Sequence, residues 1–266
     1  MQTLKKFLEQ KQEAGFFSHL TCKAAMQRFS LTCKEVELYA LELGITPLRY
    51  KRNQSTISCA AQKQLLLSHV AIIGCGGLGG HVGENLARIG VGSLCLFDFD
   101  IFEEHNLNRQ NFSNFAVIGE QKVTVVSEQL QKINPALHIK TYAKAFDVQK
   151  DFALIESCDA IIDALDDPKI KLALSLTCKQ KNKIFIHGAI GGFNAQHATC
   201  NSLENLYKTT SKGIETSVGN PSFTVTYAAA LQSAECIKSI LGLGENLQNK
   251  ILLTNLLENE FIILDN

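Results

Sequence analysis

The segment AIIGCGGLGGHVGENLARIG, residues 71–90, constrains the fold more than any other part of the chain. Short apolar residues at 70–73 lead directly into a cluster of glycines and then an amphipathic run; the glycines are Gly74, Gly76, Gly77 and Gly79. This order is typical of a strand that turns tightly into a helix whose free N–H groups bind a phosphate. The motif predicts a nucleotide site, but it serves NAD-dependent redox enzymes and ATP-consuming enzymes alike.

Each glycine of this turn has its own expected task. Gly74 allows a tight exit from the strand, Gly76 lets the backbone approach a phosphate, and Gly79 lets the helix pack closely on the sheet. The structural alternative is a glycine-rich turn that holds no ligand.

Strand and helix patterns alternate from residue 65 onward. We expect strands at 70–73, 93–97, 137–142, 159–165 and 183–190, and helices at 77–89, 121–133 and 167–180. This order predicts a doubly wound, Rossmann-like α/β domain with a largely parallel sheet. Ligands of such sheets bind beyond the carboxyl ends of the strands, where we expect Gly74, Asp98, Asp163 and Asp166.

Residues 1–47 predict a small helical appendage. The segments at 23–29 and 33–44 carry apolar residues at three- and four-residue spacing. Thr32 is expected to cap the second helix, with Glu35 completing a capping box and Gly44 closing the helix. Two helices around a tight turn also fit a helix-turn-helix, but lysines and glutamates are mixed here, so we favour a packing or dimerisation role over nucleic-acid binding.

Composition excludes several classes of protein. The 26 basic and 26 acidic side chains balance, so no large field draws the molecule to nucleic acid or an anionic membrane. No apolar stretch is long enough to span a bilayer, and the charged N-terminus lacks the apolar region that is typical of a secretory signal. Nine cysteines are dispersed without a C-x-x-C pair, so we expect reduced thiols, a cytoplasmic protein and no four-cysteine zinc site.

The residues after the second strand favour ATP over NAD. Asp98 can accept hydrogen bonds from the ribose of either nucleotide, and Asp100 is as well explained as a solvated loop carboxylate. A polar loop and a helix start then supply amides and cations: Asn106, Asn108, Arg109, Gln110 and Lys122. Such groups suit a triphosphate. Asp166, at the end of a buried strand, offers a carboxylate to Mg²⁺, and the set suits displacement at the α-phosphate.

These residues lie in an order that resembles the E1-like ThiF/MoeB/HesA adenylyltransferases, relatives of the ubiquitin-activating enzymes. The likeness covers about residues 48–266, and we therefore divide the chain into an appendage, 1–47, and an E1-like adenylation domain, 48–266. It rests on the pieces RYKRNQ, GCGGLGG, GVGSLCLFDFD, NLNRQ, IGEQK, INPALHI, IIDALDD, GAIGGFNAQ and AAALQSAECIKSILG.

The resemblance implies a role for each matching residue. ATP sits on the glycine turn, Asp98 holds the ribose and Asp166 supports Mg²⁺. The triphosphate is contacted by Asn106, Arg109, Gln110 and Lys122. Arg52 reaches into the partner subunit's site, which makes a homodimer the functional unit.

The resemblance also implies the reaction. An ATP-dependent enzyme of this kind adenylates the C-terminal glycine carboxylate of a ubiquitin-like sulfur carrier protein (ThiS/MoaD type), giving an acyl-adenylate and pyrophosphate. Sulfur delivery then makes a thiocarboxylate for thiamin or molybdopterin synthesis. The polar segment 201–213 is either the crossover loop that closes over the carrier's tail or a plain surface loop. Short strands at 250–256 and 260–265 are expected to extend the sheet on the carrier-facing side.

The sequence departs from the family at several points. The two C-x-x-C pairs that hold zinc in many members are absent, so we expect no zinc. The loop before the late helix has no cysteine for covalent transfer, and Cys178 and Cys200 are expected to be buried thiols, so we expect adenylation only. Asp167 and Lys171 stand where asparagine and arginine are common. His187, His197 and Cys200 are better explained as core or loop residues than as a metal cluster.

Three alternatives remain open from the sequence. An E1-like enzyme with another acceptor, such as a peptide or a tRNA base, needs the same adenylation residues. An NAD-dependent oxidoreductase predicts cofactor absorbance and no need for Arg109 or Lys122. A non-catalytic member predicts binding without turnover, and the set of Arg52, Arg109, Lys122 and Asp166 argues against it.

Overall fold

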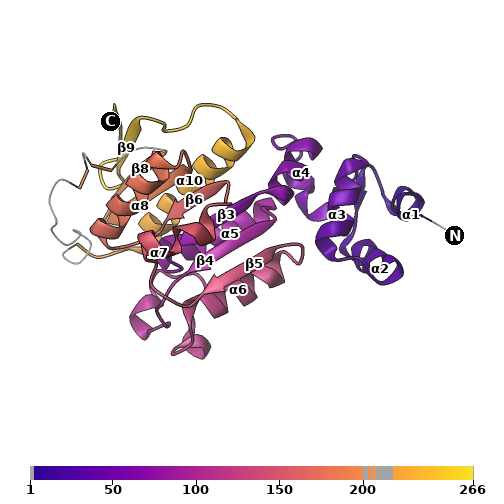
Figure 1. Cartoon of the computed structure of the whole chain (residues 1–266), viewed down its shortest axis with the longest axis horizontal. Helices are drawn as coiled ribbons and strands as arrows, with labels where there is room; N and C mark the ends of the chain where they lie inside the picture. The colour runs from indigo at the N-terminus through magenta and orange to yellow at the C-terminus, as the bar shows by residue number, and fades with distance from the viewer. Residues whose placement is uncertain (1–2, 200–202, 205, 208–217, 266) are drawn as a thin grey trace.

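The computed structural model of the chain describes residues 3–199, 203–204, 206–207 and 218–265. Cys200 and most of the segment 201–213, both considered above, lie outside these residues. The rest forms an α/β body around one large sheet, with a group of short helices extending from one end (Figure 1).

The large sheet has a parallel part and an antiparallel part. Its strands are β3 His69–Ile73, β4 Ser93–Phe97, β5 His138–Tyr142, β6 Ala160–Asp163, β7 Ile184–Gly191, β8 Asn194–Thr199, β9 Lys250–Asn255 and β10 Glu260–Asp265. They lie in the order β10-β9-β8-β7-β6-β3-β4-β5. Strands β3 to β7 pair in parallel, and β8, β9 and β10 are added antiparallel beyond β7. The sheet is therefore largely parallel and doubly wound, as the sequence predicts.

The order of the strands reverses around β3. The chain runs from β3 to β4 on one side and later returns to β6 on the other. Ile73 is in register with both Phe97 and Asp163, so Gly74, Asp98 and the loop after β6 leave the sheet side by side. Doubly wound sheets bind their ligands in the crevice at such a switch point.

Helices cover both faces of this sheet. They are α5 Gly77–Ile89, α6 Lys122–Ile133 and α10 Ser222–Leu241 on one face, and α7 Val148–Ile155 and α8 Pro168–Gln180 on the other. The first group packs on Ile72 and Leu96, and the second on Ile73 and Phe97. Because the central strands are buried on both faces, they are apolar throughout rather than alternating.

The N-terminal helices have an apolar cluster of their own. The appendage contains α1 Leu4–Lys11, β1 Phe16–Phe17, α2 His19–Phe29, α3 Cys33–Glu42 and β2 Thr46–Pro47, and it leads through the 3₁₀ helix η1 Leu48–Asn53 into α4 Cys59–Leu67. Its cluster also takes in Leu66 and Ala136 from the body. The expected capping box is confirmed: Thr32 and Glu35 each accept the other's backbone N–H. Gly44 follows with φ +76°. The domain boundary and the helix-turn-helix role stay predictions.

One predicted strand end is wrong by two residues. The strand expected over 159–165 stops at Asp163, because the Asp163 carboxylate accepts the N–H of Leu165 and bends the chain. The helix at 77–89 and the strand at 93–97 are confirmed with their bounds. Sequence reasoning did not find β8, α4, α7 or the short helices η2 Glu104–Asn106 and η3 Phe115–Val117.

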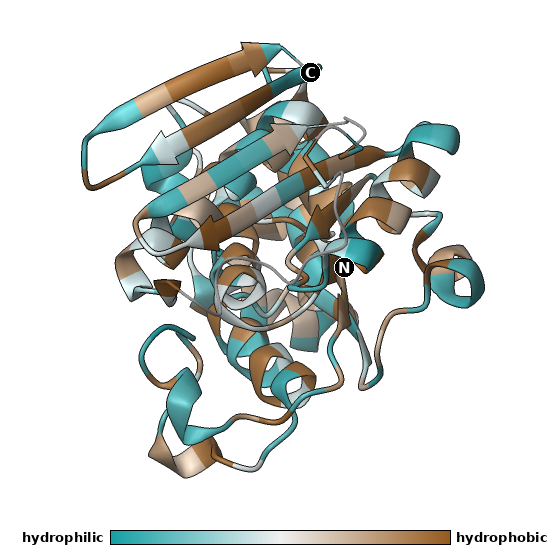
Figure 2. Cartoon of the chain, turned by 90° about the vertical axis from the view of Figure 1, so that its left-hand side faces the viewer, coloured by the Kyte–Doolittle hydropathy of each residue, from teal (hydrophilic) through white to brown (hydrophobic). Residues whose placement is uncertain are grey.

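The two C-terminal strands are confirmed as a hairpin that extends the sheet. Figure 2 shows apolar residues along this outer hairpin, and Phe261, Ile262 and Ile263 of β10 are exposed. Across the described ranges, no helix combines the length and apolarity needed to cross a membrane.

Candidate active site

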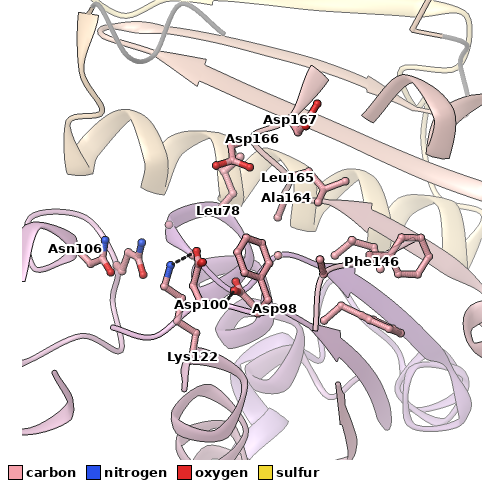
Figure 3. Close-up of a pocket in the computed structure, with 18 of the residues that line it drawn as sticks. Leu78, Asp98, Asp100, Asn106, Lys122, Phe146, Ala164, Leu165, Asp166 and Asp167 are labelled. Carbon is pink, nitrogen blue, oxygen red and sulfur yellow. Dashed lines mark hydrogen bonds and ion pairs between the residues drawn. The ribbon is translucent and has the colours of Figure 1, made fainter. Parts of the chain in front are cut away.

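A cavity of about 730 Å³ opens at the carboxyl ends of β3, β4 and β6. It brings together most of the residues singled out from the sequence (Figure 3). Those lining it are Gly74, Gly76, Gly77, Asp98, Asn106, Arg109, Gln110, Lys122 and Asp166. Gly79, Asn108 and Arg52 do not line it. The volume is within the range of small-molecule and cofactor pockets.

The glycine turn shapes one wall of the cavity. Gly74 has φ +101°, and a Cβ there would lie 2.4 Å from the carbonyl oxygen of Ala164. A Cβ on Gly79 would lie 1.8 Å from the carbonyl oxygen of Gly74, so Gly79 serves close packing, as expected, and does not face the cavity. Gly76 caps α5 without a side-chain hydrogen bond. The first N–H groups of α5 are therefore open to an anion.

Asp98 is fixed by the backbone on both sides. Its Oδ2 accepts the N–H of Cys75 at 2.7 Å, and its Oδ1 accepts the N–H of Asp100 at 2.8 Å. Burial raises the pKa of the Asp98 carboxyl, and these N–H groups and Lys122 oppose the shift. A carboxylate has about four lone-pair sites, so Asp98 can still accept two ribose hydroxyls.

The loop after β4 presents amides and one cation. Asn106 is buried, and its Oδ1 accepts the N–H of Glu103 at 3.0 Å. Gln110 is also buried, and its Oε1 has no partner among the described residues. The Arg109 guanidinium donates to the carbonyl of His105 at 3.0 Å and to Oδ1 of Asn108 at 2.9 Å.

Asn108 makes two hydrogen bonds to residues that line the cavity, and its contact with the nucleotide stays a prediction. Asn108 donates to the carbonyl of Asn220 and accepts from Arg109. Through these two bonds Asn108 holds the Arg109 guanidinium next to the backbone of Asn220.

Lys122 and Asp166 lie on opposite walls. Lys122 Nζ is 2.9 Å from Oδ2 of Asp100, which makes Asp100 part of the site, and the lysine side chain is nearly buried. Asp166 is exposed in the loop beyond β6 and lies across the cavity from Lys122 (Figure 3). Asp167 accepts the N–H of Lys169 at 2.8 Å, so this residue caps α8 and its charge is shared with the helix start.

A buried charge network lies behind the Asp166 loop. Lys171 Nζ is 3.1 Å from both oxygens of Asp163 and donates to the carbonyl of Gly188 at 3.0 Å. His187 Nδ1 is 2.7 Å from Asp163 Oδ2. Despite burial, Lys171 and His187 hold the pKa of Asp163 below its ordinary value. His187 is thus a satisfied core residue, as expected, and Lys171 supports the loop instead of reaching the phosphates.

An apolar end of the cavity was missed by sequence reasoning. Figure 3 places Phe146, Ala164 and Leu165 on one side of Asp98, and Asn106 on the other. The Phe146 ring packs edge-on against Phe97, with centroids 4.9 Å apart. An aromatic residue a few positions after the strand 138–142 was the one signal available in the sequence.

The comparisons with known proteins agree with this geometry. The model of the ThiF family matches residues 50–265. The probable molybdopterin-synthase adenylyltransferase of Gracilaria tenuistipitata var. liui is 28% identical over 232 residues, which cover 82% of this chain and 65% of that protein. The chain thus spans slightly less than two thirds of that relative's length.

Two further similarities are informative. The molybdopterin-synthase adenylyltransferase of Escherichia coli (strain K12) is 30% identical over 210 residues, which cover 75% of this chain and 84% of that protein. Among solved structures, E. coli MccB superposes with a TM-score of 0.72 at 24% identity, covering 82% of this chain and 69% of that one. With the family model matched over nearly all of the chain beyond the appendage, and with the same fold, the chain belongs to the ThiF family.

Proposed function

We propose that this chain uses ATP to adenylate the C-terminal glycine carboxylate of a ubiquitin-like sulfur carrier. One observation carries the proposal: a single cavity joins the uncapped N-terminus of α5, the backbone-fixed carboxylate of Asp98, and the cations Arg109 and Lys122. Relatives named molybdopterin-synthase adenylyltransferase support this chemistry, and a structural neighbour was solved as MccB with ATP.

The cavity orders the parts of ATP from end to end. The adenine fits the apolar end between Phe146 and Leu165, and the ribose reaches Asp98. The phosphates then cross the start of α5 and reach Arg109 and Gln110. The unpartnered Oε1 of Gln110 leaves its amide free to turn a donor toward the phosphates.

Charge balance supports Mg²⁺ as the companion of ATP. The lining carries five carboxyl groups, Asp98, Asp100, Glu103, Asp166 and Asp167, against three bases, Arg109, Lys122 and Lys144. A bare triphosphate would be repelled by such an acidic lining. Asp166 fits as the residue that holds Mg²⁺, because its carboxylate is exposed to the cavity and hard oxygen ligands suit this ion. When bound, the ion neutralises phosphate charge.

The chemical step asks the protein for position and charge. A carboxylate oxygen of the carrier attacks the α-phosphorus, the bond to the bridging oxygen breaks, and pyrophosphate leaves; no proton moves. Arg109 and Lys122 lie where they can stabilise the negative charge that develops on the phosphate oxygens.

The carrier and the partner subunit belong to this proposal. The exposed apolar side chains of β10 offer a docking face for a small carrier, at the sheet end that the family resemblance assigns to it. Arg52 is exposed on η1 and does not line the cavity of its own chain, which fits a role in trans within a homodimer. The names of the relatives favour the molybdopterin route over the thiamin route.

ATP–pyrophosphate exchange tests the proposal. The assay contains Mg²⁺, the full chain and a panel of small sulfur carriers that end in Gly-Gly. Exchange that requires one carrier and is lost in Arg109→Ala, but not in Arg88→Ala, is the expected result; Arg88 is an exposed arginine on α5 paired with Glu84. ATP binding without exchange would point to another acceptor, and NAD binding without ATP binding would overturn the proposal.

A further inference from the structure

Two cysteines and a glutamate meet inside the N-terminal appendage, far from the nucleotide cavity. Cys22 lies on α2, and Cys33 and Glu37 lie four residues apart on one face of α3. The two Sγ atoms are 3.4 Å apart, and Cys33 Sγ is 3.3 Å from Glu37 Oε1. All three residues are buried, with 4% exposure at most. Among the described residues, no other group of three such side chains approaches so closely.

The two printed spacings lie close to the edges of a tetrahedral metal site. Zinc binds thiolate sulfur at about 2.3 Å and carboxylate oxygen at about 2.0–2.2 Å, so tetrahedral edges are about 3.8 Å between sulfurs and about 3.5 Å between sulfur and oxygen. The observed 3.4 Å and 3.3 Å fall a few tenths of an ångström short of these edges. An ion can therefore enter with a small outward shift of the three ligands.

The surrounding charge favours a divalent cation. Arg49 donates to both oxygens of Glu37 at 2.6 Å and to Oδ1 of Asn134 at 2.9 Å. Two thiolates and Glu37 carry three negative charges, and a divalent ion with Arg49 carries three positive ones. The lone pair of Glu37 that now accepts the Cys33 thiol proton becomes available when that proton leaves. Arg49 also orients the carboxylate from outside, as outer partners of metal ligands do.

An entry route is present, and one further candidate ligand borders it. A cavity of about 430 Å³ reaches the cluster, and His19, Cys22, Glu37 and Arg49 are among its lining. His19 precedes Cys22 by three residues on α2, so the two share a helix face, and the imidazole is exposed to solvent. The sequence pattern is H-x-x-C followed by C-x-x-x-E.

We propose that Cys22, Cys33 and Glu37, completed by His19, form a zinc site that ties α2 to α3. Thiolates together with imidazole select zinc over calcium or magnesium. The site is unrelated to the paired C-x-x-C motifs whose absence led us to expect no zinc. Through Glu37 and Arg49 it adjoins η1, which carries Arg52.

The test uses the full chain, stripped of metal and kept reduced. One equivalent of Zn²⁺ is expected to bind per chain, measured by elemental analysis and by competition with a chromophoric chelator. Co²⁺ should give the near-ultraviolet sulfur-to-cobalt charge-transfer band. Loss of an outer partner of a metal ligand lowers metal affinity by roughly 10–100-fold. Cys22→Ser and Cys33→Ser remove ligands themselves, so each should weaken zinc binding by more than that. Cys59→Ser is the matched control, because Cys59 packs on the same apolar cluster outside the site.

A second measurement needs no variant. Bound zinc should protect Cys22 and Cys33 of the unmodified chain from alkylation, mapped by mass spectrometry, and a chelator should restore their labelling. Equal binding by the Cys33→Ser and Cys59→Ser variants would overturn the site. So would a reduced chain that takes up no zinc but forms a Cys22–Cys33 disulfide in air. Unchanged affinity in His19→Ala would overturn the assignment of the fourth ligand.

Discussion

Lys122 and Asp100 form an ion pair in the lining of the nucleotide cavity, with Nζ 2.9 Å from Oδ2. The backbone N–H of Lys122 also donates to the carbonyl of Asp100. The side chain of Lys122 is thus held in place before any phosphate arrives, although nearly half of the Asp100 side chain is exposed. A charge that is already oriented needs little reorganisation energy during the chemical step.

Lys122→Ala is expected to lower the rate of ATP–pyrophosphate exchange by about 10²–10³, the usual cost of losing one charge-stabilising donor. The matched control is Lys132→Ala, an exposed lysine on the same helix. Circular dichroism melts of both variants check that α6 remains folded. A rate for Lys122→Ala within a few-fold of the unmodified enzyme would remove Lys122 from the proposed machinery.

Gly74→Ala is expected to destabilise the protein much more than Gly119→Ala. Both glycines have positive φ, +101° and +91°, so backbone strain should lower the unfolding free energy of both variants by about 1 kcal/mol. Only at Gly74 would the new methyl meet a carbonyl oxygen at 2.4 Å, whereas nothing lies within 4 Å at Gly119. We expect a further loss of about 1–3 kcal/mol at Gly74 from overpacking. Urea unfolding of the two variants measures the difference, and equal midpoints would contradict it.

Lys171→Met is expected to cost about 3–5 kcal/mol of unfolding free energy, because it leaves the buried Asp163 carboxylate without its cation. Asp163→Asn in the same background should recover part of that loss. A double-mutant cycle by chemical denaturation therefore predicts strong coupling between the two residues. Additive effects would mean that the network does not act as a unit.

Acid should destabilise the fold partly through His197. Burial lowers the pKa of His197 from 6.5 to about 4, and its Nδ1 has no partner among the described residues. The folded protein thus binds the proton less readily than the unfolded chain. The stability that His197 contributes is complete above pH 6.5 and is lost as the pH falls towards 4, by about 3 kcal/mol.

His197→Gln isolates this contribution. Glutamine can still donate to the carbonyl of Ala228, which lies 3.1 Å from His197 Nε2. The variant should show a flatter acid limb in unfolding free energy measured from pH 7 to pH 4. Parallel curves for the two proteins would show that His197 does not titrate on unfolding.

The sequence predicted the parts of the fold that obey short, local patterns. The glycine turn was predicted correctly because a backbone with positive φ, as at Gly74, accepts few residues other than glycine. The apolar run before it was predicted correctly because a strand that is buried on both faces is apolar throughout. Gly79 and Thr32 were assigned their packing and capping tasks for the same local reason. In the candidate site, Asp98, Arg109, Gln110 and Lys122 line the cavity as expected.

What the sequence did not predict depends on tertiary contacts. The hydrogen bond from Asn108 to the backbone of Asn220 joins two positions that are distant in the chain. Phe146 joins the site because its ring packs on Phe97. This contact joins the loop after β5 to the end of β4, and the hydrophobic periodicity of the sequence does not predict it. The meeting of Cys22 with Cys33 likewise needs the crossing of α2 and α3, so counting C-x-x-C pairs missed it.

Arg49 has a consequence for how the chain can be divided. Its guanidinium holds Glu37 of the appendage and Asn134 at the end of α6 at once. A truncated protein that starts at residue 48 would keep this cation but lose its counter-charge, and would expose Leu66 to water. Residue 48 is therefore an unsuitable start for a truncated protein. A fusion or deletion variant that is meant to fold has to keep the appendage together with the ThiF domain.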